Sequence, residues 1–203
     1  MKRFISIVSA ILLLSTAVFA ADSNDGDEYD DGYVYEQNGA GDQFIKIDLG
    51  ANFPLNFDSQ LYVGGLVSIS YYKFLTQYIA VGGDVLISYN LSIGKKPLFE
   101  VPFTLGVLYQ PYIGKFEFPL MLDIGIATIS CQSMTYFPAF TAKFSAGAFY
   151  RFNESWSFGI DSTTYWIPMF FSIGVAQDNN KYRGHEFDQG VFTSACLSVR
   201  YHF

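Results

Sequence analysis

The sequence predicts an all-β fold, an eight-stranded antiparallel up-and-down transmembrane β-barrel with a disordered acidic N-terminal leader. Three features of the chain support this fold. From residue 43 to residue 203, apolar residues alternate with polar or small ones, and a period of two is typical of strands. All charges within the strands lie on the polar face. Seven consecutive strands also carry a glycine on that face.

Length and composition narrow the classes of protein. A chain of 203 residues suits one domain or two small ones, and its two cysteines exclude a disulfide scaffold. The formal charge of −7 argues against a nucleic-acid partner, which would require a basic patch. After residue 20, no apolar run is long enough to cross a membrane as a helix.

Two segments are predicted to precede the barrel domain, which spans residues 43–203. Residues 1–20 have a basic start, an apolar core and a small final residue, so we expect a cleaved secretory signal peptide. Residues 21–42 hold eight acids and no bases, which predicts a disordered periplasmic leader. A calcium site is the alternative for this leader, although its glycine spacing does not match an EF-hand loop.

Each predicted strand is long enough to span a membrane. Eleven residues tilted by about 45° rise roughly 26 Å, the height of an outer-membrane apolar band. The eight alternating runs are residues 45–53, 61–71, 79–89, 99–109, 116–126, 140–151, 156–166 and 191–203.

The apolar face is predicted to meet lipid and the polar face to line the lumen. A soluble ligand-binding barrel would place the apolar face inside. An eight-stranded interior barely holds its own side chains, so it has no room for this many apolar groups. Outward aromatic residues also gather at the strand ends, as in the two interface girdles of a membrane barrel. One girdle is Tyr71, Tyr109, Phe116, Tyr150, Trp156, Tyr201 and Phe203, and the other is Phe53, Tyr89, Phe99, Phe140 and Trp166.

The connections are predicted to differ between the two ends of the barrel. Short connections are expected to be periplasmic turns and long ones to be surface loops, and an even number of strands leaves both termini in the periplasm. The expected turns are 73–77, 110–114 and 152–155. The expected loops are 54–59, 90–97, 128–138 and 167–190. Parity also points several bulky residues into the lumen: Tyr62, Leu66, Tyr72, Leu86, Leu108, Met121, Phe149, Tyr165 and Phe192.

The chain resembles the small eight-stranded outer-membrane barrels of bacteria, the OmpA-transmembrane, OmpX and OmpW-like group. The likeness rests on the signal, the eight runs and the ending with Val199, Tyr201 and Phe203 at alternate positions. In that family a terminal Phe with such a pattern is an assembly signal. The resemblance therefore implies a bacterial outer-membrane location and three partners: outer-membrane lipid, periplasmic chaperones and the barrel-assembly machinery.

Charged residues on the lumen face form the first candidate site. They are Lys46, Asp48, Asp84, Glu100, Glu117, Asp123, Lys143, Arg151, Asp161 and Arg200. They either line a small polar passage or form a paired salt-bridge network that rigidifies a closed barrel. The second interpretation is favoured, because eight strands leave little free bore and buried charges require partners.

Pro102 and Pro119 are the second candidate site. Both point inward on neighbouring strands, each two residues after a glutamate, and proline removes a ladder donor. They mark either an opening in the wall, through which an apolar solute leaves into lipid, or bulges that adjust curvature. The bulge interpretation is favoured.

The longest loop is the third candidate site. Binding residues concentrate on loops over a rigid scaffold. An extracellular ligand would be contacted by the loop's charged and aromatic residues, and a solvated loop is the alternative. The candidates are Tyr182, Arg183, His185, Glu186 and Phe187.

The remaining observations define the predicted function. No nucleophile, metal or phosphate-binding motif occurs, so we expect no enzyme, no metal and no cofactor. Cys131 and Cys196 are predicted at different heights, which favours two free thiols over a bridge. The sequence predicts a non-catalytic envelope protein with a closed lumen that presents surface loops. The alternatives are an OmpW-like narrow channel for small, mostly apolar solutes and an adhesin acting through residues 167–190.

Overall fold

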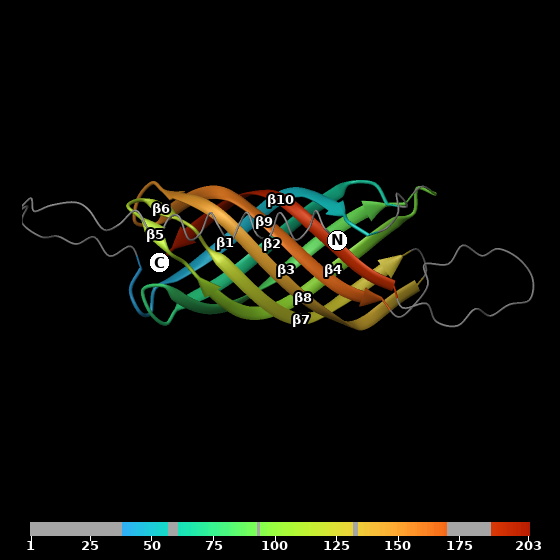
Figure 1. Cartoon of the computed structure of the whole chain (residues 1–203), viewed down its shortest axis with the longest axis horizontal. Coiled ribbons are helices and arrows are strands. Elements are labelled where there is room, and N and C mark those ends of the chain that lie inside the picture. Colours follow the sequence, from blue (N-terminus) through green and yellow to red (C-terminus); the bar gives the residue numbers. More distant parts are fainter. Residues whose placement is uncertain (1–37, 57–60, 93, 132–133, 170–187) are drawn as a thin grey trace, which may run out of the picture. The chain divides into compact units, whose positions relative to one another are not determined.

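In the computed structural model, eight long antiparallel strands form one closed barrel (Figure 1). The structure describes residues 38–56, 61–92, 94–131, 134–169 and 188–203, so the predicted signal peptide and most of the leader lie outside it. The long strands are β1 (Gln43–Pro54), β2 (Gly64–Phe74), β3 (Ile79–Leu91), β4 (Pro97–Tyr109), β7 (Leu120–Cys131), β8 (Met134–Arg151), β9 (Trp156–Met169) and β10 (Asp188–His202). No helix among these residues is long and apolar enough to span a membrane.

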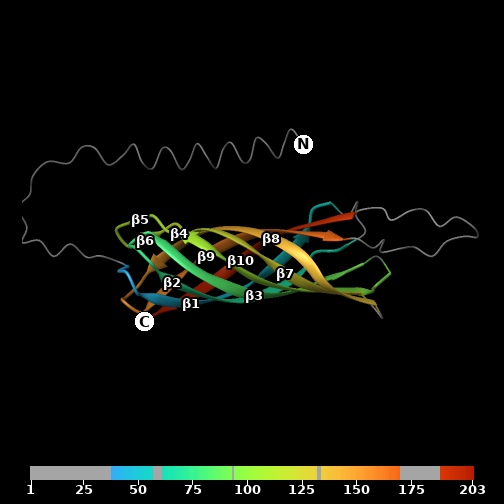
Figure 2. The same cartoon turned by 90° about the horizontal axis from the view of Figure 1, so that it is seen from below.

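Pairing between β1 and β10 closes the barrel. Ile45 stands opposite Tyr201 and Leu49 opposite Leu197, and every other long strand pairs with its neighbours in the chain. Figure 2, turned by 90° from Figure 1, shows the same strands winding around a common axis. The predicted eight-stranded up-and-down topology is confirmed.

The two ends of the barrel differ, and we name them by their connections. The turn end carries the connections 75–78 and 152–155 and the last residue of the chain, and it lies on the left in Figure 1. The loop end carries the connections that follow β1, β3, β7 and β9.

At the turn end, the predicted turn 110–114 is wrong in detail. This segment contains β5 (Tyr112–Ile113), which pairs with β6 (Phe116–Glu117) around a tight turn. The register of β5 with β6 continues that of β4 with β7, so each pair is one strand with a short break. The break occurs because Pro111 and Pro119 have no N–H to donate to the ladder. Within it, Phe118 N–H still donates to Pro111 O at 2.9 Å.

At the loop end, two predicted boundaries are wrong. Residues 128–138 were expected to form a loop, but β7 runs to Cys131 and β8 begins at Met134. A β-bulge in β8, opposite Thr128, accommodates one extra residue, so the pairing of β7 with β8 continues on both sides of Pro138. In the second case, β2 begins only at Gly64, and Tyr62, which was expected to point into the lumen, is 57% exposed.

The leader boundary also differs from the prediction. Residues 38–42 were expected to be disordered, but they lie against the turn end. Gly41 N–H donates to Phe74 O at 2.9 Å, and Phe74 N–H donates to Asp42 O at 2.8 Å. This exchange extends the β1–β2 edge, and it places the Asn38 side chain at a fully buried position.

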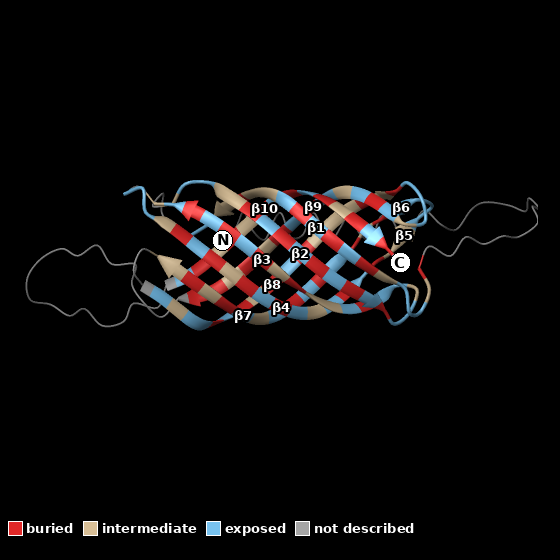
Figure 3. Ribbon diagram, turned by 180° about the vertical axis from the view of Figure 1, so that it is seen from behind, coloured by how far each residue is buried: buried red, intermediate tan, exposed pale blue. Residues whose placement is uncertain are grey.

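Burial alternates along each strand, as Figure 3 shows by the succession of red and pale blue segments. The inward residues include the charged groups and two apolar clusters. The turn-end cluster is Phe44, Tyr72, Phe74, Ala80, Leu108 and Met121. The loop-end cluster is Leu66, Leu86, Leu98, Ala127, Ile129, Ala139, Tyr165, Ile167, Phe192 and Cys196. Apart from Tyr62, the bulky residues predicted to point inward are buried.

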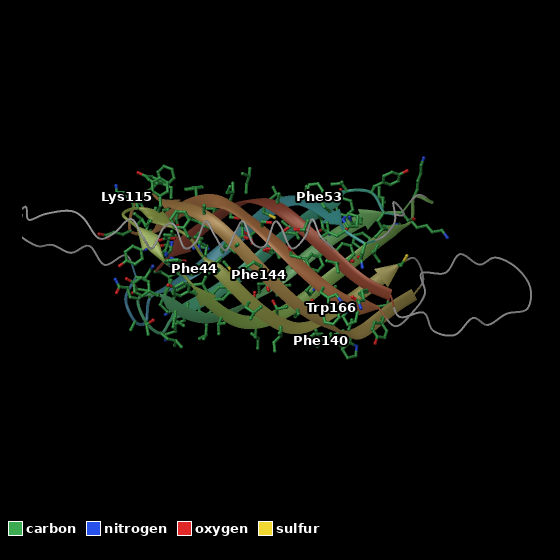
Figure 4. All side chains as sticks on the ribbon, in the orientation of Figure 1. Phe44, Phe53, Lys115, Phe140, Phe144 and Trp166 are labelled. Carbon is green, nitrogen blue, oxygen red and sulfur yellow. The ribbon has the colours of Figure 1, made fainter. Side chains whose placement is uncertain are left out.

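The outer surface is apolar, and packed pairs of outward aromatic residues lie toward both ends. Phe140 and Trp166 pack edge to face with centroids 6.0 Å apart toward the loop end, whereas Trp156 and Tyr201 pack 4.9 Å apart at the turn end. Figure 4 shows Phe140 and Trp166 on the loop side of Phe144, and Lys115 at the opposite end. An exposed apolar belt of this kind matches the lipid-facing surface of a membrane barrel.

Replacing Leu105 with Arg tests this orientation. Leu105 is 73% exposed near the middle of β4, so the Leu105→Arg variant should lose about 2–4 kcal/mol of stability in a bilayer, as a midplane Arg does. The measurement is urea unfolding of lipid-refolded protein. The control is Ile113→Arg at the turn end, where the expected cost is about 0–1 kcal/mol. Equal costs at the two positions would contradict a lipid-facing midplane at Leu105.

Candidate functional site: the charged lumen

Glycines lie close to large lumen side chains and, having no β-carbon, leave room for them. A β-carbon on Gly159 would lie 2.7 Å from Cγ of Phe149, and one on Gly147 would lie 2.9 Å from Cε2 of the same ring. Real β-carbons do not approach other atoms this closely, so only glycine fits beside Phe149. The glycines predicted on the lumen face thus make room here for the Phe149 ring.

The first ionic group is a lysine between two aspartates. Lys46 Nζ lies 3.0 Å from Asp48 Oδ2 and 2.5 Å from Asp161 Oδ2, which joins β1 to β9 across the lumen. Ser68 Oγ on β2 donates to Asp48 Oδ2 at 2.5 Å. All three charged groups are buried, and two carboxylates with one ammonium give this group one excess negative charge.

The second ionic group repeats this composition on other strands. Lys143 Nζ on β8 lies 2.6 Å from Asp84 Oδ1 and 3.2 Å from Asp123 Oδ2. Thr104 Oγ1 donates to Asp84, and Tyr72 OH donates to Asp123 Oδ1 at 2.7 Å. This group also carries one excess negative charge.

The third ionic group has the opposite composition, with one acid and two bases. Glu117 Oε1 lies 3.3 Å from Arg151 NH1, and Glu117 Oε2 lies 3.4 Å from Arg200 NH1. Arg151 NH1 also donates to Asn38 Oδ1 at 2.9 Å, and Arg200 NH1 donates to Gln110 Oε1 at 2.8 Å. The group is positive by one charge and lies at the turn end.

Arg200 in this third group also lies between two aromatic rings. Its guanidinium carbon is 3.6 Å from the centroid of Phe149 and 4.7 Å from that of Phe44. The side chain is fully buried, so these cation–π contacts replace part of its hydration. His202, two residues later, is also buried and shares a 2.7 Å hydrogen bond between Nε2 and Ser157 Oγ.

Glu100 is held differently from the other acids. Its Oε2 accepts hydrogen bonds from Tyr165 OH at 2.7 Å and from Ser88 Oγ at 2.9 Å. Asn52 Nδ2 donates to Tyr165 OH and to Asn90 Oδ1, both at 2.8 Å. No Lys, Arg or His side chain of the described residues forms a salt bridge with Glu100.

The structure therefore brings nine of the ten predicted lumen charges into three groups and leaves Glu100 apart. Sequence analysis missed several neutral partners, because they stand at the ends of the alternating runs or beyond them: Asn38, Asn52, Asn90 and Gln110. Asn52, Asn90 and Gln110 stand at inward positions of the alternating pattern, and this position was the signal that could have identified them. Within the described residues, no cluster of three or more His, Cys, Asp or Glu side chains has the arrangement of a metal site.

The two prolines do not share a site. Both are buried, but Pro102 stands opposite Ala127, whereas the register around Pro119 places it beside Gln110. Gln110 is eight residues after Pro102 on the same strand, which is about 26 Å at 3.3 Å per residue. Pro102 alone coincides with a gap between long strands: β3–β4 pairing stops after Val85 and resumes at Ser88.

The other predicted residues are placed as follows. Tyr201 and Phe203 point outward at the turn end, with ring centroids 6.0 Å apart, and Val199 pairs with Ile47. Both cysteines are free, with Cys196 buried and Cys131 half-buried. The loop candidates Tyr182, Arg183, His185, Glu186 and Phe187 lie outside the described residues.

Comparison with solved structures agrees with this architecture. The crystal structure of Neisserial surface protein A has a TM-score of 0.58 at 10% identity, over 80% of this chain and 99% of that one. The outer membrane protein OprG from Pseudomonas aeruginosa has a TM-score of 0.52 at 12% identity, over 83% and 98%. These likenesses show the fold. The chain has the fold of the small eight-stranded outer-membrane β-barrels.

Sequence comparison then gives the family. A family model whose description names no activity matches residues 24–201, and the chain belongs to this uncharacterized family. A relative in Treponema pallidum (strain Nichols), described as an uncharacterized protein, is 29% identical over 189 residues, which is 84% of this chain and 81% of that protein.

Removing Glu117 tests whether the third ionic group holds the turn end together. The Glu117→Gln variant removes the carboxylate that the buried Arg151 and Arg200 share, so we expect a loss of about 3–5 kcal/mol in urea unfolding. The matched control is Asp84→Asn, in which Lys143 keeps Asp123, and its expected cost is about 1–2 kcal/mol. Equal losses in the two variants would contradict the paired-charge account.

Proposed function

We propose that the protein is a non-catalytic integral protein of a bacterial outer membrane, with a lumen closed to solutes. It would serve as a rigid envelope component that presents the loop-end connections. The observation that supports this proposal is the filling of the lumen along its whole length. An apolar cluster lies toward each end, and the ionic groups hold paired charges inside the barrel.

Burial of the largest lumen side chains supports closure. Tyr72, Phe44 and Arg200 fill the turn end, and Tyr165 and Phe192 stack 5.1 Å apart in the loop-end cluster. All five are fully buried, so a water-sized sphere does not reach them. Eight strands give a bore that side chains of this size fill.

The proposed orientation places the turn end in the periplasm and the loop end outside the cell. Short turns and long loops divide between these sides in outer-membrane barrels. The predicted signal peptide would direct secretion across the inner membrane, and the acidic leader would remain periplasmic. Periplasmic chaperones and the barrel-assembly machinery would be its partners during assembly, with Val199, Tyr201 and Phe203 as the assembly signal.

A narrow conduit for apolar solutes is the second candidate function. It is supported by the pairing gap at Leu86 and Ile87, opposite Val101 and Pro102. Beside this gap, a groove of about 750 Å³ lies on the outer face, with Val85 and Phe103 among its lining residues. An apolar solute would leave the lumen through the gap and enter this groove.

Conductance in a planar bilayer separates the two functions. Refolded protein, checked by its heat-dependent shift on a gel, should give no steady openings if the lumen is closed. Steady openings whose size changes in Glu100→Gln, Asp123→Asn or Arg200→Met variants would overturn closure. Uptake of an apolar dye into vesicles, lost on Pro102→Ala substitution, would favour the conduit.

The two cysteines give an independent test of closure. Cys196 points into the lumen and is 5% exposed, whereas Cys131 at the loop end is half-buried. A charged, membrane-impermeant methanethiosulfonate should modify Cys131 in folded protein and modify Cys196 only after unfolding. Cys131→Ser and Cys196→Ser variants report each thiol alone. Modification of Cys196 in folded protein at the unfolded rate would show that solutes reach the lumen.

A further inference from the structure

Glu100 has no charge partner in a lumen where the other described charges are grouped. The lumen strands carry six acids and four Lys or Arg residues. Every one of the four bases belongs to an ionic group described above, and each lies within 4.0 Å of a carboxylate other than Glu100. A buried carboxylate without a charge partner is costly, so it either takes up a proton or holds a cation beside it.

The surroundings of Glu100 are neutral and closed to bulk solvent. Its side chain is fully buried, and its backbone stands between Ser88 on β3 and Ile129 on β7. Ile129 and Leu98 belong to the loop-end apolar cluster and are 1% exposed. Water from the bulk therefore does not replace the missing charge partner.

Two oxygens of this polar cluster have no hydrogen-bond donor among the described residues. They are Oε1 of Glu100 and Oδ1 of Asn52, and both are buried. Tyr165 connects their two side chains, because its hydroxyl donates to Glu100 Oε2 and accepts from Asn52 Nδ2. The unpartnered atoms of the two linked residues are thus all acceptors, which is what a cation requires and an anion does not.

We infer that the cluster of Asn52, Ser88, Asn90, Glu100 and Tyr165 binds one monovalent hard cation, with Na⁺ as the physiological ion. Its carboxylate, amide and hydroxyl oxygens are the ligand types that hard cations prefer. Charge selects the valence: one carboxylate balances one monovalent ion, whereas a divalent ion would leave a buried positive charge. The ion would tie β1, β3, β4 and β9 together beneath the loops, whether or not the lumen conducts.

Thermal unfolding in different salts tests this inference. Protein refolded in detergent or lipid is heated in NaCl or in N-methylglucamine chloride at equal ionic strength. A ligand that binds only folded protein stabilises it in proportion to the logarithm of its concentration. Above the dissociation constant, the midpoint should rise by roughly 3–6 °C for each tenfold increase in Na⁺. No such rise at any Na⁺ concentration would overturn the inference.

Variants assign the effect to Glu100. In Glu100→Gln the Na⁺-dependent rise should disappear, whereas Asp84→Asn, which removes a lumen carboxylate from an ionic group, should keep it. An equal Na⁺ effect in all three proteins would mean general salt stabilisation and would overturn the site. Crystals of the unsubstituted protein soaked in Tl⁺ provide a second measurement that needs no variant. An anomalous peak within about 3 Å of Glu100 supports the site, and no peak there overturns it.

Discussion

Closure of the sheet by β1 and β10 is the constraint on which the other features of the structure depend. In a membrane every backbone donor and acceptor must be satisfied within the protein, and a closed barrel does this without an edge. Closing after eight strands fixes a narrow bore. The inward residues must then share a small volume, which explains why glycines flank Phe149 and why the largest inward side chains are fully buried.

The narrow bore also requires that buried charged side chains lie close to groups of opposite charge. Each of the two lumen lysines lies between two aspartates, and Glu117 lies between two arginines, so no group is neutral alone. The positive group lies at the turn end, and Glu100 lies beside the loop-end apolar cluster. Among the described residues, the unbalanced charge is therefore positive at the turn end and negative beside the loop-end apolar cluster.

The fold could be predicted from the sequence because alternation in a strand assigns each residue to a face without any knowledge of its partners. Lys143 and Asp123 were placed in the lumen by parity alone. Their ion pair could not be predicted, because it depends on which strands are adjacent and on the register between them. Asn38 and Gln110 were missed for another reason: both lie outside the predicted alternating runs, Asn38 before the first run and Gln110 just after the fourth, although Gln110 keeps the inward parity of its strand.

The two prolines show the same limit of parity. Inward parity grouped Pro102 with Pro119, but parity says nothing about height, and register separates them by most of a strand. Their surroundings differ accordingly. Pro119 lies in a break where flanking hydrogen bonds continue, such as Gly147 N–H to Pro119 O at 3.1 Å, whereas Pro102 faces an unpaired stretch of β3. Of the two prolines, only Pro102 thus lies opposite an interruption of the β3–β4 ladder.

Strand β10 links closure of the barrel to the burial of Arg200 beside a carboxylate. Its outward residues Tyr201 and Phe203 lie in the turn-end aromatic band, while its inward residue Arg200 reaches Glu117 and stacks on Phe149. Strand β10 therefore brings a second guanidinium to Glu117 and a cation to the Phe149 ring. The ionic group at the turn end is thus completed by the same step that removes the last free edge. Docking of this strand gains backbone hydrogen bonds and buried charge pairing together, which favours a closed barrel over an open sheet.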